Sequence, residues 1–157
     1  MNLVFIAVGK LRESHYRMGV EEYLTRIRHF LPVDHIEVPA GTGEDGNGKG
    51  RGALLREAAV IERHLQREGK VVALDAGGTM LNTEQFADWL QRNMSASVPR
   101  ISFVIGGAWG LAPGFLEQAD LRLSLSPMTF PHELARLVLA EQVYRALSIW
   151  KNLPYHK

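Results

Sequence analysis

The sequence predicts an α/β protein built on an open, mostly parallel β-sheet with helices on both faces. Short apolar runs alternate five times with longer amphipathic patterns, which gives the element order βαβαβαβαβα. The first run, residues 3–8, is continuously apolar and ends at Gly9, as is typical of a strand buried on both faces of a parallel sheet. At 157 residues and 46% hydrophobic content, we expect one domain over residues 1–157.

Hydrophobic spacing and turn residues place each element. The expected strands are residues 3–8, 35–38, 71–74, 101–105 and 121–125. The expected helices are residues 12–30, residues 53–68, a helix from Asn82 to about residue 94, a short helix opened by Pro113 and a long helix opened by Pro131. Asn82 with Gln85 three residues later has the spacing of a capping box. Proline suits a first helical position because its missing N–H would have no partner there.

Composition excludes several kinds of chemistry. There are no cysteines, which excludes disulfides, thiol catalysis and cysteine-based metal sites and fits a cytoplasmic protein. The six histidines show no ligand-like pairing, so we expect no metal. The apolar start has no basic region before it, so it reads as a strand and not as a signal peptide, and no segment is long enough to span a membrane.

Two local features have a simple interpretation that we favour. The glycine-rich stretch 41–52 nearly matches a dinucleotide-binding motif and a P-loop, but it carries two carboxylates, and Gly50 replaces the metal-binding Ser or Thr of a P-loop. A flexible, solvated loop is the better interpretation. A basic patch before and along the first helix indicates either a solvated face or a contact for RNA phosphates, and spacing alone favours the solvated face. That patch comprises Lys10, Arg12, Arg17, Arg26, Arg28 and His29.

Three glycine-containing or polar loops are expected at one edge of the sheet, outside the carboxyl ends of strands, where such sheets bind ligands. They are residues 74–78, 105–110 and 123–130. Glycines let a backbone approach a ligand closely and expose its N–H and C=O groups. None of the three loops carries a basic residue to balance phosphates, so the predicted pocket suits a purine and a thioether better than a polyphosphate.

The last helix and the tail carry further candidate residues. Glu141 falls on or near the apolar face of the helix, and Arg145, four residues on, is its nearest candidate partner. His132 begins the helix beside the predicted pocket and is either a capping residue or a general base. Tyr155 and His156 lie in the terminal NLPYHK, where chain ends usually fray.

Several motifs are specific enough to indicate a protein family. The run LSLSPMTFPHELARLVLAEQVYRA with a terminal PYHK resembles the ribosomal RNA large-subunit methyltransferase H family of the SPOUT class, and FVIGGAWGL, VALDAGG and LVFIAVGK are similar to it too. The resemblance spans essentially the whole chain. It implies S-adenosyl-L-methionine-dependent methylation of N3 of a pseudouridine in 23S rRNA of assembled ribosomes. It also implies a homodimer and a C-terminal trefoil knot that holds the cofactor, although the general rule for protein chains is against knots.

Carried over by motif, the resemblance implies two sets of site residues. The cofactor contacts fall on Leu74, Gly106, Leu125, Ser126, Pro127, Met128, Thr129 and Phe130. The positions near the substrate are His132, Arg145, Tyr155 and His156. Two departures stand out: residues 150–153 read WKNL where relatives commonly have a Gly-Glu pair, and Ala108-Trp109 stands where smaller residues are common.

The implied chemistry fits these residue types. Attack by the N3 of an imide needs its weakly acidic proton removed, which His132 or His156 can do, while Arg145 stabilises developing charge. No metal is required. Two alternatives stay open: a noncatalytic ribosome-binding module and a Rossmann-like nucleotide enzyme. We further expect the last helix and an exposed Trp150 to contribute to the dimer interface.

Overall fold

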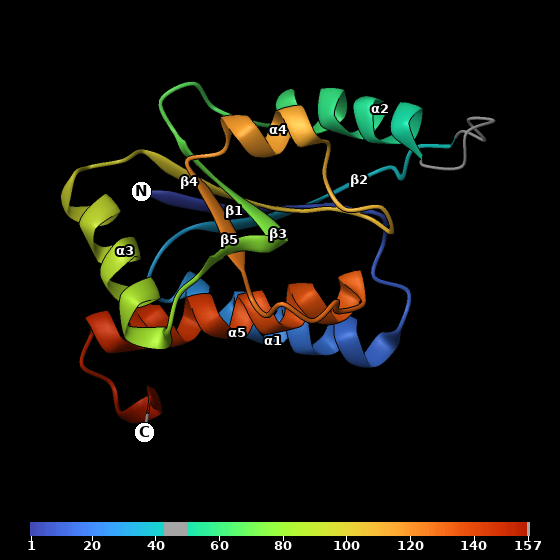
Figure 1. Ribbon diagram of the computed structural model, residues 1–157. Coiled ribbons are helices and arrows are strands. Elements are labelled where there is room, and N and C mark those ends of the chain that lie inside the picture. The colour runs from blue at the N-terminus through green and yellow to red at the C-terminus, as the bar shows by residue number, and fades with distance from the viewer. Residues whose placement is uncertain (43–49, 157) are drawn as a thin grey trace.

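The computed structural model describes residues 1–42 and 50–156, with the side chain of His156 left out, and it confirms the predicted element order (Figure 1). The strands are β1 (Asn2–Val8), β2 (Val33–Val38), β3 (Lys70–Met80), β4 (Arg100–Ile105) and β5 (Leu121–Ser124). The helices are α1 (Ser14–Arg28), α2 (Arg51–Glu62), α3 (Thr83–Ser95), α4 (Pro113–Gln118), α5 (His132–Trp150) and the short 3₁₀ helix η1 (Pro154–His156).

The five strands form one parallel sheet in the order β2-β1-β4-β3-β5. The first strand lies in the interior of the sheet, where Leu3 pairs with Val33 of β2 on one side and with Ile101 of β4 on the other, and its apolar residues are buried. Parallel neighbours require crossover connections, which the helices supply. The carboxyl ends of β3, β4 and β5 therefore meet at one edge.

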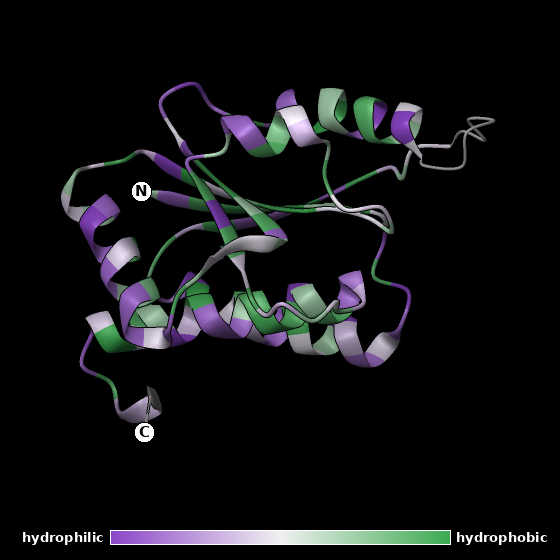
Figure 2. Cartoon of the chain, in the orientation of Figure 1, coloured by the Kyte–Doolittle hydropathy of each residue, from purple (hydrophilic) through white to green (hydrophobic). Residues whose placement is uncertain are grey.

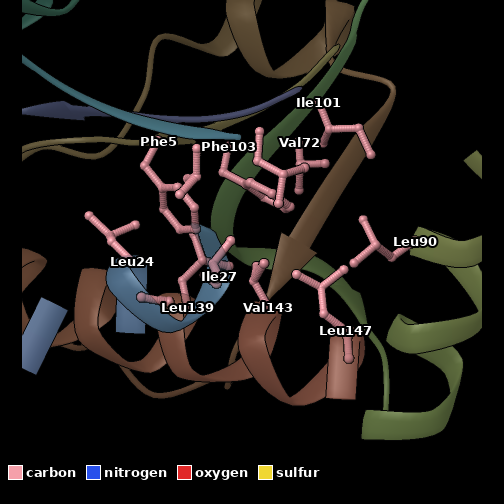
Figure 3. Close-up of a cluster of buried hydrophobic side chains, with 14 of the residues drawn as sticks. Phe5, Leu24, Ile27, Val72, Leu90, Ile101, Phe103, Leu139, Val143 and Leu147 are labelled. Carbon is pink, nitrogen blue, oxygen red and sulfur yellow. The ribbon is translucent and has the colours of Figure 1, made fainter. Parts of the chain in front are cut away.

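Helices cover both faces of the sheet, as predicted. In Figure 1, α2 and α4 lie above the sheet and α1, α3 and α5 lie below it. The lower core is the larger, and Figure 3 shows Phe5 and Phe103 of the sheet over Leu24, Leu139 and Val143 of the helices. Figure 2 shows apolar green stretches in the strands and alternating green and purple bands along the helices, as expected for amphipathic helices. Burial on both faces explains why strands read as continuous apolar runs.

Helix and strand boundaries follow the predicted punctuation with three differences. The capping box is confirmed, because the Asn82 side chain accepts from the Gln85 N–H and the Gln85 side chain accepts from the Asn82 N–H. The second helix ends at Glu62 and not at residue 68, and turns lead on from there. The long helix begins at His132, with Pro131 as its N-cap and not as its first residue.

The third difference lies in β3, which was expected to end at Leu74. It continues to Met80, because pairing with β5 breaks off after Leu74 and resumes at Thr79. The interruption contains the glycine pair of LDAGG, which sequence reasoning took for the end of the strand. Gly78 has to be small, since a Cβ there would lie 2.6 Å from the carbonyl oxygen of Arg122. Among the described residues, no helix is long and apolar enough to cross a membrane.

Candidate functional site

The three predicted loops converge on one cavity of about 650 Å³, which lies at the carboxyl ends of β4 and β5 and beside the interruption that follows Leu74 in β3. Its deep wall is apolar and buried, with Ile105, Leu111 and Leu123 each less than a tenth exposed. The other lining residues come from all three loops, from α4 and from the start of α5. They are Leu74, Asp75, Ala76, Gly106, Gly107, Ala108, Trp109, Gly110, Leu116, Leu125, Ser126, Met128, Thr129, Phe130, Pro131, His132 and Ala135.

The cavity contains nearly the whole set of cofactor residues that the resemblance implied. Of the eight, Pro127 alone is absent from the lining. Pro127 lies within a turn that the Ser126 side chain closes, because its Oγ accepts a hydrogen bond from the Met128 N–H at 3.0 Å. The turn presents the residues on either side of Pro127 to the cavity.

A tight glycine turn forms one wall of the cavity. Gly107 and Gly110 face each other in a β-bridge, and the Gly110 N–H donates to the Gly107 carbonyl at 3.1 Å. Gly110 has a left-handed φ of 76°, and a Cβ there would meet nothing within 4 Å, so open space lies beside this backbone. Gly106 is different, because a Cβ there would lie 2.4 Å from the Gly110 carbonyl oxygen. The turn closes only with glycine at position 106.

The charge of the cavity is low. Neither lysine nor arginine is among its lining residues, and its one carboxylate, Asp75, is paired with Arg122 at 2.5 Å. His132, the first residue of α5, is half-buried at the cavity edge. An apolar floor, backbone polar groups and a single histidine suit a ligand without phosphates.

Arg145 and Tyr155 lie away from the cavity. Thirteen residues of helix separate His132 from Arg145, which corresponds to about 20 Å along the axis. Arg145 forms the predicted ion pair with Glu141, with nitrogen–oxygen distances of 2.6 and 2.9 Å, and that bond raises the pKa of Arg145. Within the chain, His132 is therefore separated from Arg145.

The tail docks on the same end of α5. The Tyr155 hydroxyl donates to Glu141 at 3.2 Å and lies 3.1 Å from the hydroxyl of Tyr23 on α1. Burial, together with the bond to Tyr23, raises the pKa of Tyr155. Tyr144 contacts the Tyr155 ring edge-on at 4.6 Å, and the Arg145 guanidinium lies 4.9 Å from its centroid. Tyr155 is thus held by contacts and not frayed.

Some of the predicted residues lie outside the described part of the chain, and Trp150 is placed differently from the prediction. The side chain of His156, the residue Lys157 and the glycine-rich residues 43–49 lie outside the described part of the chain. Trp150, expected to be exposed, is half-buried against the lower core, with the Lys151 ammonium 3.9 Å from its ring centroid. The prediction of an exposed Trp150 was wrong because the last turn of α5 still faces the core.

Sequence reasoning missed the network that fixes the start of α5. Arg136 is only 1% exposed, donates to the carbonyl oxygens of Val8 and Gly9 at 2.8 Å each, and pairs with Glu37 at 3.1 Å. Burial lowers the pKa of Arg136. Glu133 accepts a hydrogen bond from the Arg12 N–H, which lowers the pKa of Glu133. The only sign of this network in the sequence was that Glu133 and Arg136 fall near the apolar face of the last helix.

Three of the six residues of the basic patch make side-chain contacts within the chain. Arg26 bonds Glu22, Arg28 bonds Glu21 at 2.6 Å, and Arg17 donates to the carbonyl oxygen of Leu11 at 3.0 Å. These contacts agree with the solvated face that we favoured. Within residues 1–42 and 50–156, no cluster of three or more His, Cys, Asp or Glu side chains has a metal-binding arrangement.

Comparison with known proteins defines first the class. A family model described as "Predicted SPOUT methyltransferase" matches residues 1–156. A probable methyltransferase from Bordetella pertussis Tohama I has the same fold, with a TM-score of 0.56 over 93% of this chain and 96% of that one, at 15% identity.

Two relatives then define the family. Proteins named "Ribosomal RNA large subunit methyltransferase H" from Alkaliphilus oremlandii (strain OhILAs) and Gemmatimonas aurantiaca are 39% and 41% identical to this chain, each over the full length of both proteins. The chain belongs to this family of SPOUT methyltransferases.

Proposed function

We propose that the protein transfers the methyl group of S-adenosyl-L-methionine to N3 of a pseudouridine in 23S rRNA of assembled ribosomes. The supporting names are those of its full-length relatives. The observation that carries the proposal is the cavity, because seven of the eight residues implied for the cofactor line it. Since its substrate would be the ribosome, we expect the protein in the cytoplasm. We also infer one domain over residues 1–157 and a C-terminal trefoil knot.

The residues present fit this cofactor. Open space beside the Gly110 backbone lets a ligand approach the turn closely, and the buried floor suits an adenine ring. The lining contains no cation that would hold a dinucleotide's phosphates, which disfavours the Rossmann-like alternative. When bound, S-adenosyl-L-methionine would supply an electrophilic methyl group on a sulfonium. The residues named for it are Leu74, Gly106, Leu125, Ser126, Met128, Thr129 and Phe130, with Pro127 shaping the turn.

His132 is the candidate general base that the cavity offers. It lies at the cavity edge, and the anchored first turn of α5 fixes its backbone through Glu133 and Arg136. The His132 imidazole would take the proton from N3, and the bound cofactor would supply the methyl group and leave as a neutral thioether, so the charges would balance. His156, the other candidate, keeps that role as a prediction.

A second copy of the chain would complete the site. Arg145 lies about 20 Å along α5 from His132, too far for both to act on the same base within one protomer, and Tyr155 is docked beside Arg145. We infer a homodimer in which Arg145, Tyr155 and His156 of one protomer serve the cavity of its partner. There, Arg145 would stabilise the charge that develops on the base.

Mixing two inactive variants tests this division. His132→Ala and Arg145→Ala should each lose activity, while a refolded mixture regains part of it, because some dimers carry one site with both native residues. A mixture as inactive as its components, or sedimentation of the wild type as a monomer at micromolar concentration, would contradict the shared site.

The activity itself is tested with ribosomes that lack the modification. The protein and methyl-labelled S-adenosyl-L-methionine are incubated with these ribosomes, and the 23S rRNA is digested to nucleosides. We expect label in N3-methylpseudouridine. Label in another nucleoside would change the target, and cofactor binding without any transfer would favour the noncatalytic ribosome-binding module.

A further inference from the structure

Trp109 is the unusual residue of the cavity. It lines the cavity, yet 62% of its surface is exposed, while its loop neighbours Ile105 and Leu111 are almost fully buried. An indole has a large apolar surface to bury, and leaving most of it in water gives up stabilisation of the fold. A large exposed aromatic at the edge of a cavity therefore indicates contact with something that the folded chain does not itself provide.

The indole is held in place and does not project freely. It rests on the backbone of Gly50, where a Cβ would come within 2.8 Å of the Trp109 Cδ1 and 3.0 Å of its Cγ. Its backbone belongs to the turn closed by the Gly107–Gly110 bridge. A ring that is already positioned loses little conformational entropy when it stacks on a ligand.

The position of the ring relative to the cavity floor indicates which reactant it meets. Ile105, Leu111 and Leu123 form the buried floor, whereas Trp109 and Met128, 62% and 75% exposed, form the rim. A structured RNA is too large to enter, so only a base extruded from the stack can reach a reaction centre inside. Such a base has to pass the rim, while the cofactor occupies the deeper part.

Other aromatic side chains are less suited to this task. Phe130 lines the cavity but is half-buried. Tyr155, which the sequence suggested as a stacking residue, has Tyr144 against it at 4.6 Å and the Arg145 guanidinium near its ring. Trp109 has the most exposed ring of the three, and its indole offers the largest stacking surface.

We propose that Trp109 is a substrate-binding residue that stacks on the extruded pyrimidine base of the RNA at the mouth of the cavity. The inference rests on the proposed function and extends it to a residue that departs from the family pattern. Stacking recognises the face of the base, so it would stabilise the extruded state without reading the base edge. Edge recognition would be left to the polar groups of the cavity.

The test compares Trp109→Ala and Trp109→Phe with Leu55→Ala. Leu55, on α2, is also 62% exposed but does not line the cavity, so its variant controls for loss of surface apolar area. Three quantities are measured for each variant: kcat/KM for methylation of unmodified ribosomes, the Kd for S-adenosylhomocysteine by calorimetry, and the sedimentation coefficient.

We expect Trp109→Ala to lower kcat/KM by roughly tenfold, with Trp109→Phe recovering most of the loss, because a phenyl ring still stacks. The Kd for S-adenosylhomocysteine, the sedimentation coefficient and the activity of Leu55→Ala should stay at wild-type values. An unchanged kcat/KM in Trp109→Ala would overturn the proposal. An equal loss of cofactor affinity would assign the indole to the cofactor, and a monomeric variant would assign it to the dimer interface.

The outcomes also separate this proposal from the proposed function. If the wild type methylates ribosomes and Trp109→Ala does so equally well, only the stacking role fails. If the wild type binds S-adenosylhomocysteine but methylates no ribosomes, the rRNA activity fails, and the stacking role fails with it.

Discussion

Adding one methyl group at Gly106 should distort the wall of the cavity. The new Cβ would lie 2.4 Å from the Gly110 carbonyl oxygen and 2.5 Å from its carbonyl carbon, whereas real Cβ atoms essentially never come closer than 3.0 Å to such atoms. Both contacts are with backbone, so no side chain can rotate away. We expect Gly106→Ala to destabilise the fold by about 1–3 kcal/mol, the usual cost of overpacking.

The same distortion should reach the ligand. Opening the turn displaces the backbone of Gly107 and Gly110, which lines the cavity, so the affinity for S-adenosylhomocysteine should fall by roughly tenfold or more. A side chain at position 106 would not simply fill the space that the cofactor needs. In the structure, the backbone of Gly110 blocks that side chain first.

Gly114→Ala is the matched control. Gly114 lies in the first turn of α4, and a Cβ there meets nothing within 4 Å, so alanine should be neutral or stabilise by about 0.5–1 kcal/mol. Urea unfolding gives the stability of each variant, and calorimetric titration gives its affinity. A Gly106→Ala protein as stable as Gly114→Ala, with native affinity, would refute the argument.

Three further predictions follow from the α5 contacts. Arg136→Met should destabilise the protein by about 3 kcal/mol in urea unfolding, because the buried carbonyl of Val8 and the half-buried carbonyl of Gly9 lose the donor that Arg136 supplies. Arg28→Met breaks an exposed ion pair and should cost less than about 1 kcal/mol. Equal losses in the two variants would contradict the role of burial. The folded-state pKa of Glu133 lies below its ordinary value of 4.5, so its contribution is present above pH 4.5 and is lost as the pH falls through the lower folded value. As the pH falls, the free energy of unfolding of Glu133→Gln, measured with urea, should therefore decrease less than that of the wild type. Parallel plots of unfolding free energy against pH for the two proteins would contradict this role of the Glu133 carboxylate. Deleting residues 154–157 removes the hydrogen bond from Tyr155 to Glu141, which is the partner of Arg145. We expect methyl transfer to ribosomes to fall by roughly tenfold or more while cofactor binding persists. Equal methylation rates for the truncated and full-length proteins would show that the tail has no part in the mechanism.

The sequence was sufficient for the fold because its signals were local and mutually consistent. Apolar runs, caps and glycines placed ten elements in order, and the rule about strand ends placed three loops at one edge before any contact was known. The extension of β3 to Met80 was missed because a Gly-Gly pair reads locally as a turn, whereas pairing with β5 depends on a strand some forty residues away.

The parts of the site that failed to emerge from the sequence depend on distant contacts. Arg136 contacts residues of β1 and β2 that lie more than ninety residues away in the chain. Helical spacing therefore shows that a charged residue falls near the apolar face of the helix, but it does not show what that residue binds. The docking of Tyr155 on Tyr23 spans 132 residues. By contrast, the pair of Glu141 and Arg145 was predictable, because i, i+4 neighbours on a helix always face each other.

The central claim is that the cavity at the carboxyl ends of β4 and β5, beside the interruption of β3, binds S-adenosyl-L-methionine. Calorimetric titration of the wild-type protein with S-adenosyl-L-methionine, S-adenosylhomocysteine and NAD tests it most directly. We predict binding of both sulfur ligands, weakened in Gly106→Ala, and no binding of NAD, because the lining residues include no cation for its phosphates. Binding of NAD, or no binding of either sulfur ligand, would contradict the account.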